Sequence, residues 1–128
     1  MDYTIKNLHE VEDQAPKFGA GETQEARFPR EDLNSETVGL AFHRVKAGKR
    51  QGFAHRHQDA EEIYVILAGT GRIKLDDEVK EVGPLDAIRV APKVARAFEA
   101  DSGGNLELLA FGPRHAGDGE LIHEGFWD

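Results

Sequence analysis

Short runs of alternating hydrophobic and polar residues, separated by glycine, proline, aspartate and asparagine, occupy the middle of the chain. Such runs are typical of short β-strands joined by turns. They predict strands at residues 38–45, 53–57, 62–67, 72–75, 79–82, 86–90, 96–100 and 106–111. Asp76-Asp77 predicts a hairpin between two of these strands, and the run DSGGN at 101–105 predicts a turn. The sequence therefore predicts an all-β protein.

The run EIYVIL at 62–67 carries the strongest strand signal, because it is rich in β-branched residues and two glycines soon end it. Tyr64 and Ile66 share one face with Glu62, whereas Ile63 and Leu67 lie on the other face. A strand that is apolar on both faces is expected to be covered on both. The two candidates for the outer cover are another layer of this chain and a second subunit.

The two ends of the chain show weaker patterns. Residues 4–5 and Leu8 are predicted to form an edge strand, and residues 13–30 are predicted to be irregular. The tail contains the aromatic pair Phe126-Trp127, and such a pair commonly packs a terminus onto the body of a protein. We therefore expect terminal segments that pack on a central barrel at residues 38–111.

The composition narrows the class of protein. A length of 128 residues matches one domain, so we predict a single domain over residues 1–128. The chain has no cysteine, which excludes disulfides and thiolate metal sites. The formal net charge of −8 and the lack of a basic stripe argue against a nucleic-acid partner. No segment has the pattern of a signal peptide or a membrane span, so we expect a cytoplasmic protein with no membrane partner.

Two histidines and a glutamate form the strongest chemical signal. Residues i and i+2 of a strand point to the same face, so His55 and His57 project together while Arg56 faces away. Glu62 begins the next strand, where it can return beside both histidines. Two imidazoles and one carboxylate on one face suit a divalent first-row metal and leave coordination positions open for water, substrate or oxygen.

The segment HRHQDAEEIYVILAG at 55–69 resembles the first motif of the cupin superfamily, which runs His-x-His, four residues, Glu, six residues, Gly. These positions are filled by His55, His57, Glu62 and Gly69. Lys49 stands where the motif has a leading glycine, and Gly48 precedes it. The resemblance covers residues 38–111. It implies a single-domain cupin-type jelly-roll β-barrel (double-stranded β-helix), commonly a homodimer.

The second cupin motif is degenerate in this chain. DAIRVAPKVARAFEA at 86–100 resembles it, with Pro92 in the proline position and Lys93 in place of the glycine. Arg96 stands where the resemblance implies a further metal-ligating histidine. An arginine stays protonated and does not ligate a metal, so the expected site has three protein ligands or no metal at all.

Two hypotheses for the pocket follow. In the first, His55, His57 and Glu62 bind a divalent ion (Mn, Fe, Ni or Zn), and Arg96 clamps a small anionic molecule such as a carboxylate. In the second, no metal is bound, Glu62 forms a buried ion pair with Arg96, and the pocket binds a small anion or polar molecule. No organic cofactor is expected in either.

Strand parity brings three more side chains to the same pocket, which are Gln51, Tyr64 and Phe98. Tyr64 and Phe98 fit the barrel core equally well. We therefore expect Arg96, Tyr64, Gln51 and Phe98 as ligand-binding candidates.

His43 is the candidate for a replacement metal ligand or a further pocket residue. Leu40 and Phe42 lie on the opposite face of its strand and are the more natural core residues, which favours a partly exposed His43. Three further histidines are weaker candidates: His115 follows the last strand, and His9 and His123 lie in the terminal segments.

The resemblance implies two classes of function. The first is a small metalloenzyme, because dioxygenases, isomerases and decarboxylases all occur among cupins. The second is a non-catalytic binding or storage protein that uses the barrel pocket. Fold alone does not choose between them.

Overall fold

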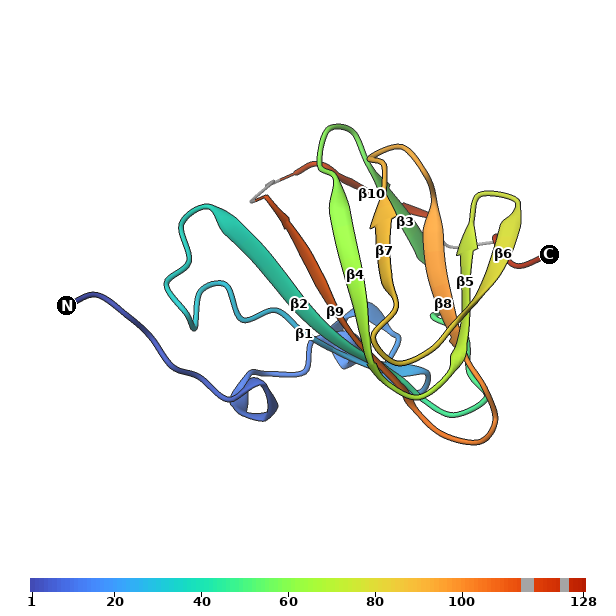
Figure 1. Ribbon diagram of the computed structural model, residues 1–128, viewed down its shortest axis with the longest axis horizontal. Coiled ribbons are helices and arrows are strands. Elements are labelled where there is room, and N and C mark those ends of the chain that lie inside the picture. Colours follow the sequence, from blue (N-terminus) through green and yellow to red (C-terminus); the bar gives the residue numbers. More distant parts are fainter. Residues whose placement is uncertain (114–116, 123–124) are drawn as a thin grey trace.

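The computed structural model describes residues 1–113, 117–122 and 125–128. Two antiparallel five-stranded sheets face each other across a hydrophobic core (Figure 1). The first sheet has the strand order β1-β2-β9-β4-β7, built from β1 (Gln24–Arg27), β2 (Val38–Val45), β9 (Leu106–Pro113), β4 (Glu62–Ala68) and β7 (Ala87–Val90). The second has the order β10-β3-β8-β5-β6, built from β10 (Gly119–Ile122), β3 (Ala54–His57), β8 (Arg96–Ala100), β5 (Gly71–Leu75) and β6 (Glu78–Val82). This is the predicted all-β, jelly-roll architecture.

All eight predicted strands are present, with ends that move by no more than two residues. The core between the sheets contains Tyr64, Ile66, Ile73, Phe98 and Leu108, each at most 2% exposed. Burial of these side chains is the main source of stability, since a fully buried side chain of this size contributes about 1.5–3 kcal/mol.

In the turn that follows β4, the position of Gly69 accepts only glycine. Its φ of +82° lies in the left-handed region, and a Cβ placed there would lie 2.0 Å from the carbonyl oxygen of Asn105. Because β4 must pass this close to the turn before β9, the motif glycine is a packing requirement.

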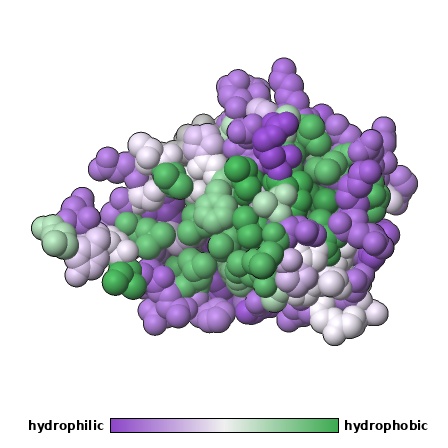
Figure 2. All heavy atoms as spheres, viewed as in Figure 1, coloured by the Kyte–Doolittle hydropathy of each residue, from purple (hydrophilic) through white to green (hydrophobic). Residues whose placement is uncertain are grey.

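The outer face of the first sheet is partly apolar and partly exposed. Ile63 pairs with Phe111 across β4 and β9, and the two side chains are 42% and 37% exposed, as is Leu67 at 43%. Figure 2 shows hydrophobic residues gathered over this part of the molecule. Within the described residues, no further layer of the chain buries this part of the face, where β4 and β9 pair.

The N-terminal prediction was wrong in two places. Residues 4–5 form no strand, and Leu8–Glu10 form a short 3₁₀ helix (η1), where Asn7 Oδ1 accepts a hydrogen bond from the His9 amide at 2.8 Å. The segment expected to be irregular contains a second 3₁₀ helix, η2 (Ala15–Phe18), and strand β1.

The sequence did not predict strand β1, because its residues, QEAR, have little β-propensity. It is held instead by pairing with β2 and by an ion-pair network. Glu25 contacts Arg27 at 2.7 Å and Arg44 at 2.6 Å, and Arg44 contacts Glu107 at 2.9 Å.

The tail lies on the second sheet, as the aromatic pair predicted. Strand β10, which the sequence analysis did not predict, pairs with β3. The Arg50 guanidinium then lies 4.9 Å from the centre of the Trp127 ring, and the Lys74 ammonium 5.0 Å from that of Phe126. No helix among the described residues is long and apolar enough to cross a membrane.

Candidate metal centre and cavity

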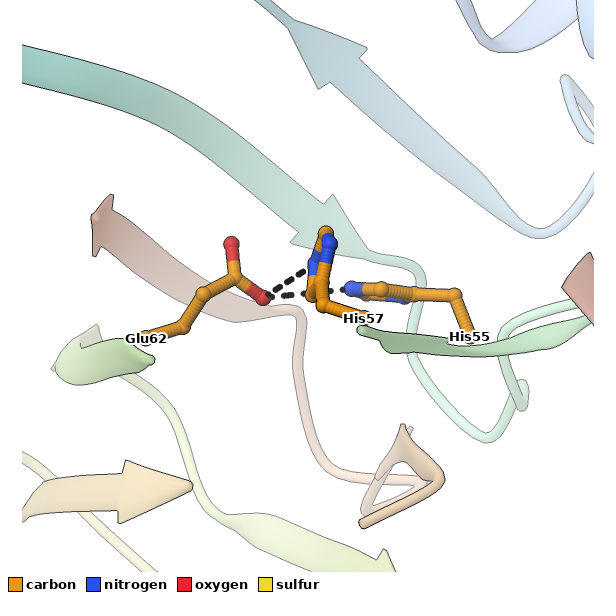
Figure 3. Close-up of side chains that lie close together, drawn as sticks. All are labelled: His55, His57 and Glu62. Carbon is orange, nitrogen blue, oxygen red and sulfur yellow. Dashed lines mark hydrogen bonds and ion pairs between the residues drawn. The ribbon is translucent and has the colours of Figure 1, made fainter. Parts of the chain in front are cut away.

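The two histidines and the glutamate meet as the spacing predicted. His55 and His57 extend from β3 and Glu62 from the first residue of β4 (Figure 3). Glu62 Oε1 lies 3.3 Å from His55 Nε2 and 3.1 Å from His57 Nε2. The Tyr64 hydroxyl donates a hydrogen bond to the same oxygen at 2.9 Å. Glu62 Oε1 is therefore in contact with three side chains, two from β3 and one from its own strand, β4.

Asp118 supports this arrangement and was missed by the sequence analysis. Its carboxylate accepts hydrogen bonds from the amides of Gln58, Asp59 and Ala60, at 2.9, 3.1 and 3.0 Å, so it fixes the turn between β3 and β4. Asp118 Oδ2 also lies 3.5 Å from His57 Nδ1. A carboxylate behind a histidine is the usual means of orienting a metal ligand. Its position 56 residues after Glu62 gave no sequence signal.

Burial and hydrogen bonds together set the protonation states of the cluster. Burial would raise the pKa of the Glu62 carboxyl, but hydrogen bonds with His55, His57 and Tyr64 outweigh it and hold that pKa well below its ordinary value. Burial lowers the pKa of His55, although Glu62 opposes that shift. Burial, together with the charge of Glu62, raises the pKa of Tyr64 well above its ordinary value. Glu62 is thus anionic and Tyr64 is a hydrogen-bond donor at neutral pH.

The donor set fits a divalent metal ion. One ligand atom from each of His55, His57 and Glu62 can be chosen so that all three lie within 4.8 Å of one another. Ligands at about 2.1 Å from a metal and at right angles to each other lie about 3 Å apart, which is close to the 3.1 and 3.3 Å separations here. Two imidazoles and a carboxylate suit Mn, Fe, Ni or Zn.

The three side chains line a cavity of about 430 Å³. The polar part of its lining includes two more of the residues that the sequence predicted for the pocket, Gln51 and Tyr64. Gln51 is tied into the structure, because its Nε2 donates to Gln24 Oε1 at 2.9 Å and its Oε1 accepts from the Phe98 amide at 3.0 Å. The apolar part of the lining includes Phe18, Phe28, Leu40, Phe53 and Leu121.

The structure places two of the ligand-binding candidates behind the cavity lining. Arg96 is 1% exposed, and its guanidinium donates long hydrogen bonds to the carbonyl oxygens of Ala91 and Pro92, at 3.3 and 3.5 Å. Phe98 is 1% exposed and packs edge-on against Tyr64, with ring centres 5.2 Å apart. Neither residue is part of the cavity lining, although β8 lies beside β3 and Arg96 pairs with His55 across the two strands.

His43 is partly exposed, as predicted, but the prediction for the face that it occupies was wrong. His43 lines the cavity on the same side of β2 as the buried Ala41 and Val45. Phe42 is also buried, on the other side of the strand, where the His9 ring packs edge-on against it with centres 6.4 Å apart. The parity argument failed because the N-terminal segment covers that outer side. His115 and His123 lie outside the described residues.

His43 joins the two parts of the cavity. Its ring packs edge-on against Phe28, with ring centres 5.9 Å apart, and its Nδ1 is buried with no hydrogen-bond partner among the described residues. Burial lowers its pKa to about 4, and the nearby His55 adds to this shift. His43 is therefore a neutral residue of the cavity wall. It is not part of the group formed by His55, His57 and Glu62.

Comparison with known proteins identifies one family whose model matches this chain, and several proteins that are similar to it. Residues 41–112 match the family model of the cupin domain. An uncharacterised protein of Methanocaldococcus jannaschii is 36% identical over 70 residues. That match covers 53% of this chain and 56% of the relative, so the chain spans little more than half the length of the curated relative that it matches.

Solved structures with the same fold span different functions. A cupin protein from Bacteroides fragilis is 23% identical, with a TM-score of 0.73 over 98% of this chain and 96% of that chain. A polyketide cyclase from Streptomyces resistomycificus is 18% identical, with a TM-score of 0.77 over 95% of this chain and 85% of that chain. At these identities the likeness shows the fold alone.

Proposed function

Because this chain belongs to the cupin family, we propose that it binds a divalent metal ion through His55, His57 and Glu62 and uses that ion to hold a small organic molecule in the cavity. The observation that supports this most directly is that all three donors lie together and line one cavity. A metal held there can therefore also be reached from the cavity.

The residues around the ligands supply the rest of the site. Tyr64 and Asp118 orient Glu62 and His57 through the contacts described above. A divalent ion in this site would supply Lewis acidity toward an oxygen atom of the bound molecule, which is the common ground of dioxygenase-, isomerase- and decarboxylase-like chemistry. The proposed function is thus that of a metalloenzyme site, whose substrate is selected by the cavity wall.

The metal-free alternative required an ion pair between Glu62 and Arg96. Among the described residues, the acidic side chain Glu62 pairs with histidines, and the hydrogen bonds of the Arg96 guanidinium go to main-chain carbonyls. The observations therefore favour the metal hypothesis.

Metal content tests the proposal directly. The protein is incubated anaerobically with Mn²⁺, Fe²⁺, Ni²⁺ or Zn²⁺, dialysed, and subjected to elemental analysis before and after chelation. We expect about one ion per chain, lost in His57→Ala and retained in His9→Ala, a matched histidine outside the cavity. Protein that stays metal-free with all four ions would overturn the proposal.

We also propose that the chain is a homodimer through the outer face that contains Ile63, Leu67 and Phe111. Exposed apolar side chains gathered on one sheet face are typical of an interface. Sedimentation equilibrium should give twice the chain mass, and Ile63→Lys should shift it toward the monomer. A monomeric native protein at micromolar concentration would contradict the interface.

A further inference from the structure

The apolar part of the cavity lining carries information about the bound molecule that the candidate metal ligands do not. Three phenylalanines, Phe18, Phe28 and Phe53, line it from separate parts of the chain. Phe18 and Phe28 pack edge-on with ring centres 6.4 Å apart, and they are 52% and 44% exposed. Two aromatic rings left this exposed beside a cavity represent apolar surface that a ligand can cover.

A cluster of polar side chains lines another part of the cavity. It contains His55, His57, Glu62 and Tyr64, and Glu62 interacts with both His55 and Tyr64. The remaining polar lining residues are Gln24, Arg30, His43 and Gln51. Among the described residues that line the cavity, Arg30 is the only arginine or lysine. Since Arg96 is behind the wall, the cavity lacks the several fixed cations that a phosphate or a small dicarboxylate requires.

We infer that the ligand is an apolar ring compound with one hydroxyl or enol oxygen, which places its ring body against Phe18, Phe28 and Phe53 and its oxygen at the His55–His57–Glu62 group. The volume of about 430 Å³ lies in the range of cavities that enclose small organic molecules. The contact of the ligand oxygen (the oxygen end) rests on the proposed metal function. The contact of the ligand ring (the ring end) does not, because it depends on the phenylalanines.

The expected ligand differs from the small anion that the sequence predicted. That expectation depended on Arg96 reaching the pocket, and the guanidinium is instead held by carbonyl oxygens behind it.

Binding of 2-naphthol tests the ring end without a metal. Chelator-treated protein is titrated with 2-naphthol by calorimetry and equilibrium dialysis, and we expect saturable one-site binding. Phe28→Ala should weaken it about five- to tenfold, because an aromatic contact of this kind is lost. Phe126→Ala is the matched control: this partly exposed phenylalanine packs on Lys74 and Trp127 and does not line the cavity, so affinity should stay within about twofold.

Binding to the Zn²⁺-loaded protein tests the oxygen end. We expect 2-naphthol to bind at least about tenfold more tightly than to the metal-free protein, and more tightly than oxalate or glucose 6-phosphate. Loss of Zn²⁺ binding with intact, Phe28-dependent naphthol binding would overturn the proposed function and leave the ring site standing. Absent or Phe28-independent naphthol binding, or tighter binding of oxalate, would overturn the inference itself.

Discussion

The two ends of the cavity are built in opposite ways. The metal-binding end, as proposed above, comes from eight consecutive residues, 55–62, on two successive strands of opposite sheets and the turn between them. The apolar end comes from η2, from the segment after β1, from the residue before β3 and from β10, which are far apart in the sequence. The comparison indicates that chemistry is encoded locally in this chain, whereas the choice of ligand depends on distant segments that fold over the cavity.

Glu62→Gln should separate the two ends with the largest effect. It keeps the shape of the side chain and removes the charge that both histidines contact. Loss of a supporting partner alone costs about 10–100-fold in metal affinity, so loss of a ligand should cost at least about 100-fold. Competition with a chromogenic chelator measures this for Zn²⁺.

The control for Glu62→Gln is binding of 2-naphthol to the metal-free variant, which should match wild type within about threefold because the phenylalanine wall is unchanged. If the affinities for Zn²⁺ and for 2-naphthol fell by the same factor, the two ends of the cavity would form one cooperative unit.

Asp118→Asn should weaken the metal-binding end without removing a ligand. It keeps an acceptor for the amides of the 58–60 turn, but it removes the charge beside His57 Nδ1. We expect a loss of about 10–100-fold in Zn²⁺ affinity with little change in thermal stability. Asp86→Asn, which alters a similar turn-capping aspartate at Gly83, should leave Zn²⁺ affinity unchanged.

The sequence predicted the fold and the meeting of two histidines with a glutamate, because both depend on local periodicity. Parity along β3 placed His55 and His57 together, and the turn length returned Glu62 to them. The same rule failed for His43, because deciding which face of β2 is interior requires knowing that the N-terminal segment covers Phe42.

The rest of the site could not be predicted, because its signals are non-local. Asp118 acts through amides about 60 residues away, and Phe28 through a cavity shared with β10. Arg96 was expected in the pocket, but its buried guanidinium donates to the Ala91 and Pro92 carbonyls, and the sequence gives no signal for these contacts.

Asp13→Ala should loosen the apolar end selectively. Asp13 Oδ1 accepts hydrogen bonds from the amides of Ala15 and Ala26, at 3.0 and 2.9 Å, and so ties η2 to β1. Loss of both bonds should lower the free energy of unfolding by about 1–3 kcal/mol in urea. Affinity for 2-naphthol should fall severalfold, because Phe18 and Phe28 flank this contact.

Asn105→Ala is the matched control for Asp13→Ala, since it removes a comparable side-chain acceptor, for the Ala47 amide, away from the cavity. It should leave 2-naphthol affinity unchanged. A loss of Zn²⁺ affinity in Asp13→Ala as large as the loss of naphthol affinity would contradict the separation of the two ends.

His43→Asn tests the boundary between the ends and should have the smallest effect at neutral pH. The folded protein holds the pKa of His43 at about 4, below the ordinary 6.5, because the ring is buried beside His55. The unfolded chain therefore binds this proton more readily, so the stability linked to His43 is fully present above pH 6.5 and is lost as the pH falls toward 4. In His43→Asn, the pH dependence of the free energy of unfolding over this window should be shallower by up to about one bound proton, measured as urea midpoints. An unchanged slope would mean that His43 takes up its proton inside the folded cavity, and that the apolar end reaches water more freely than its phenylalanine wall indicates.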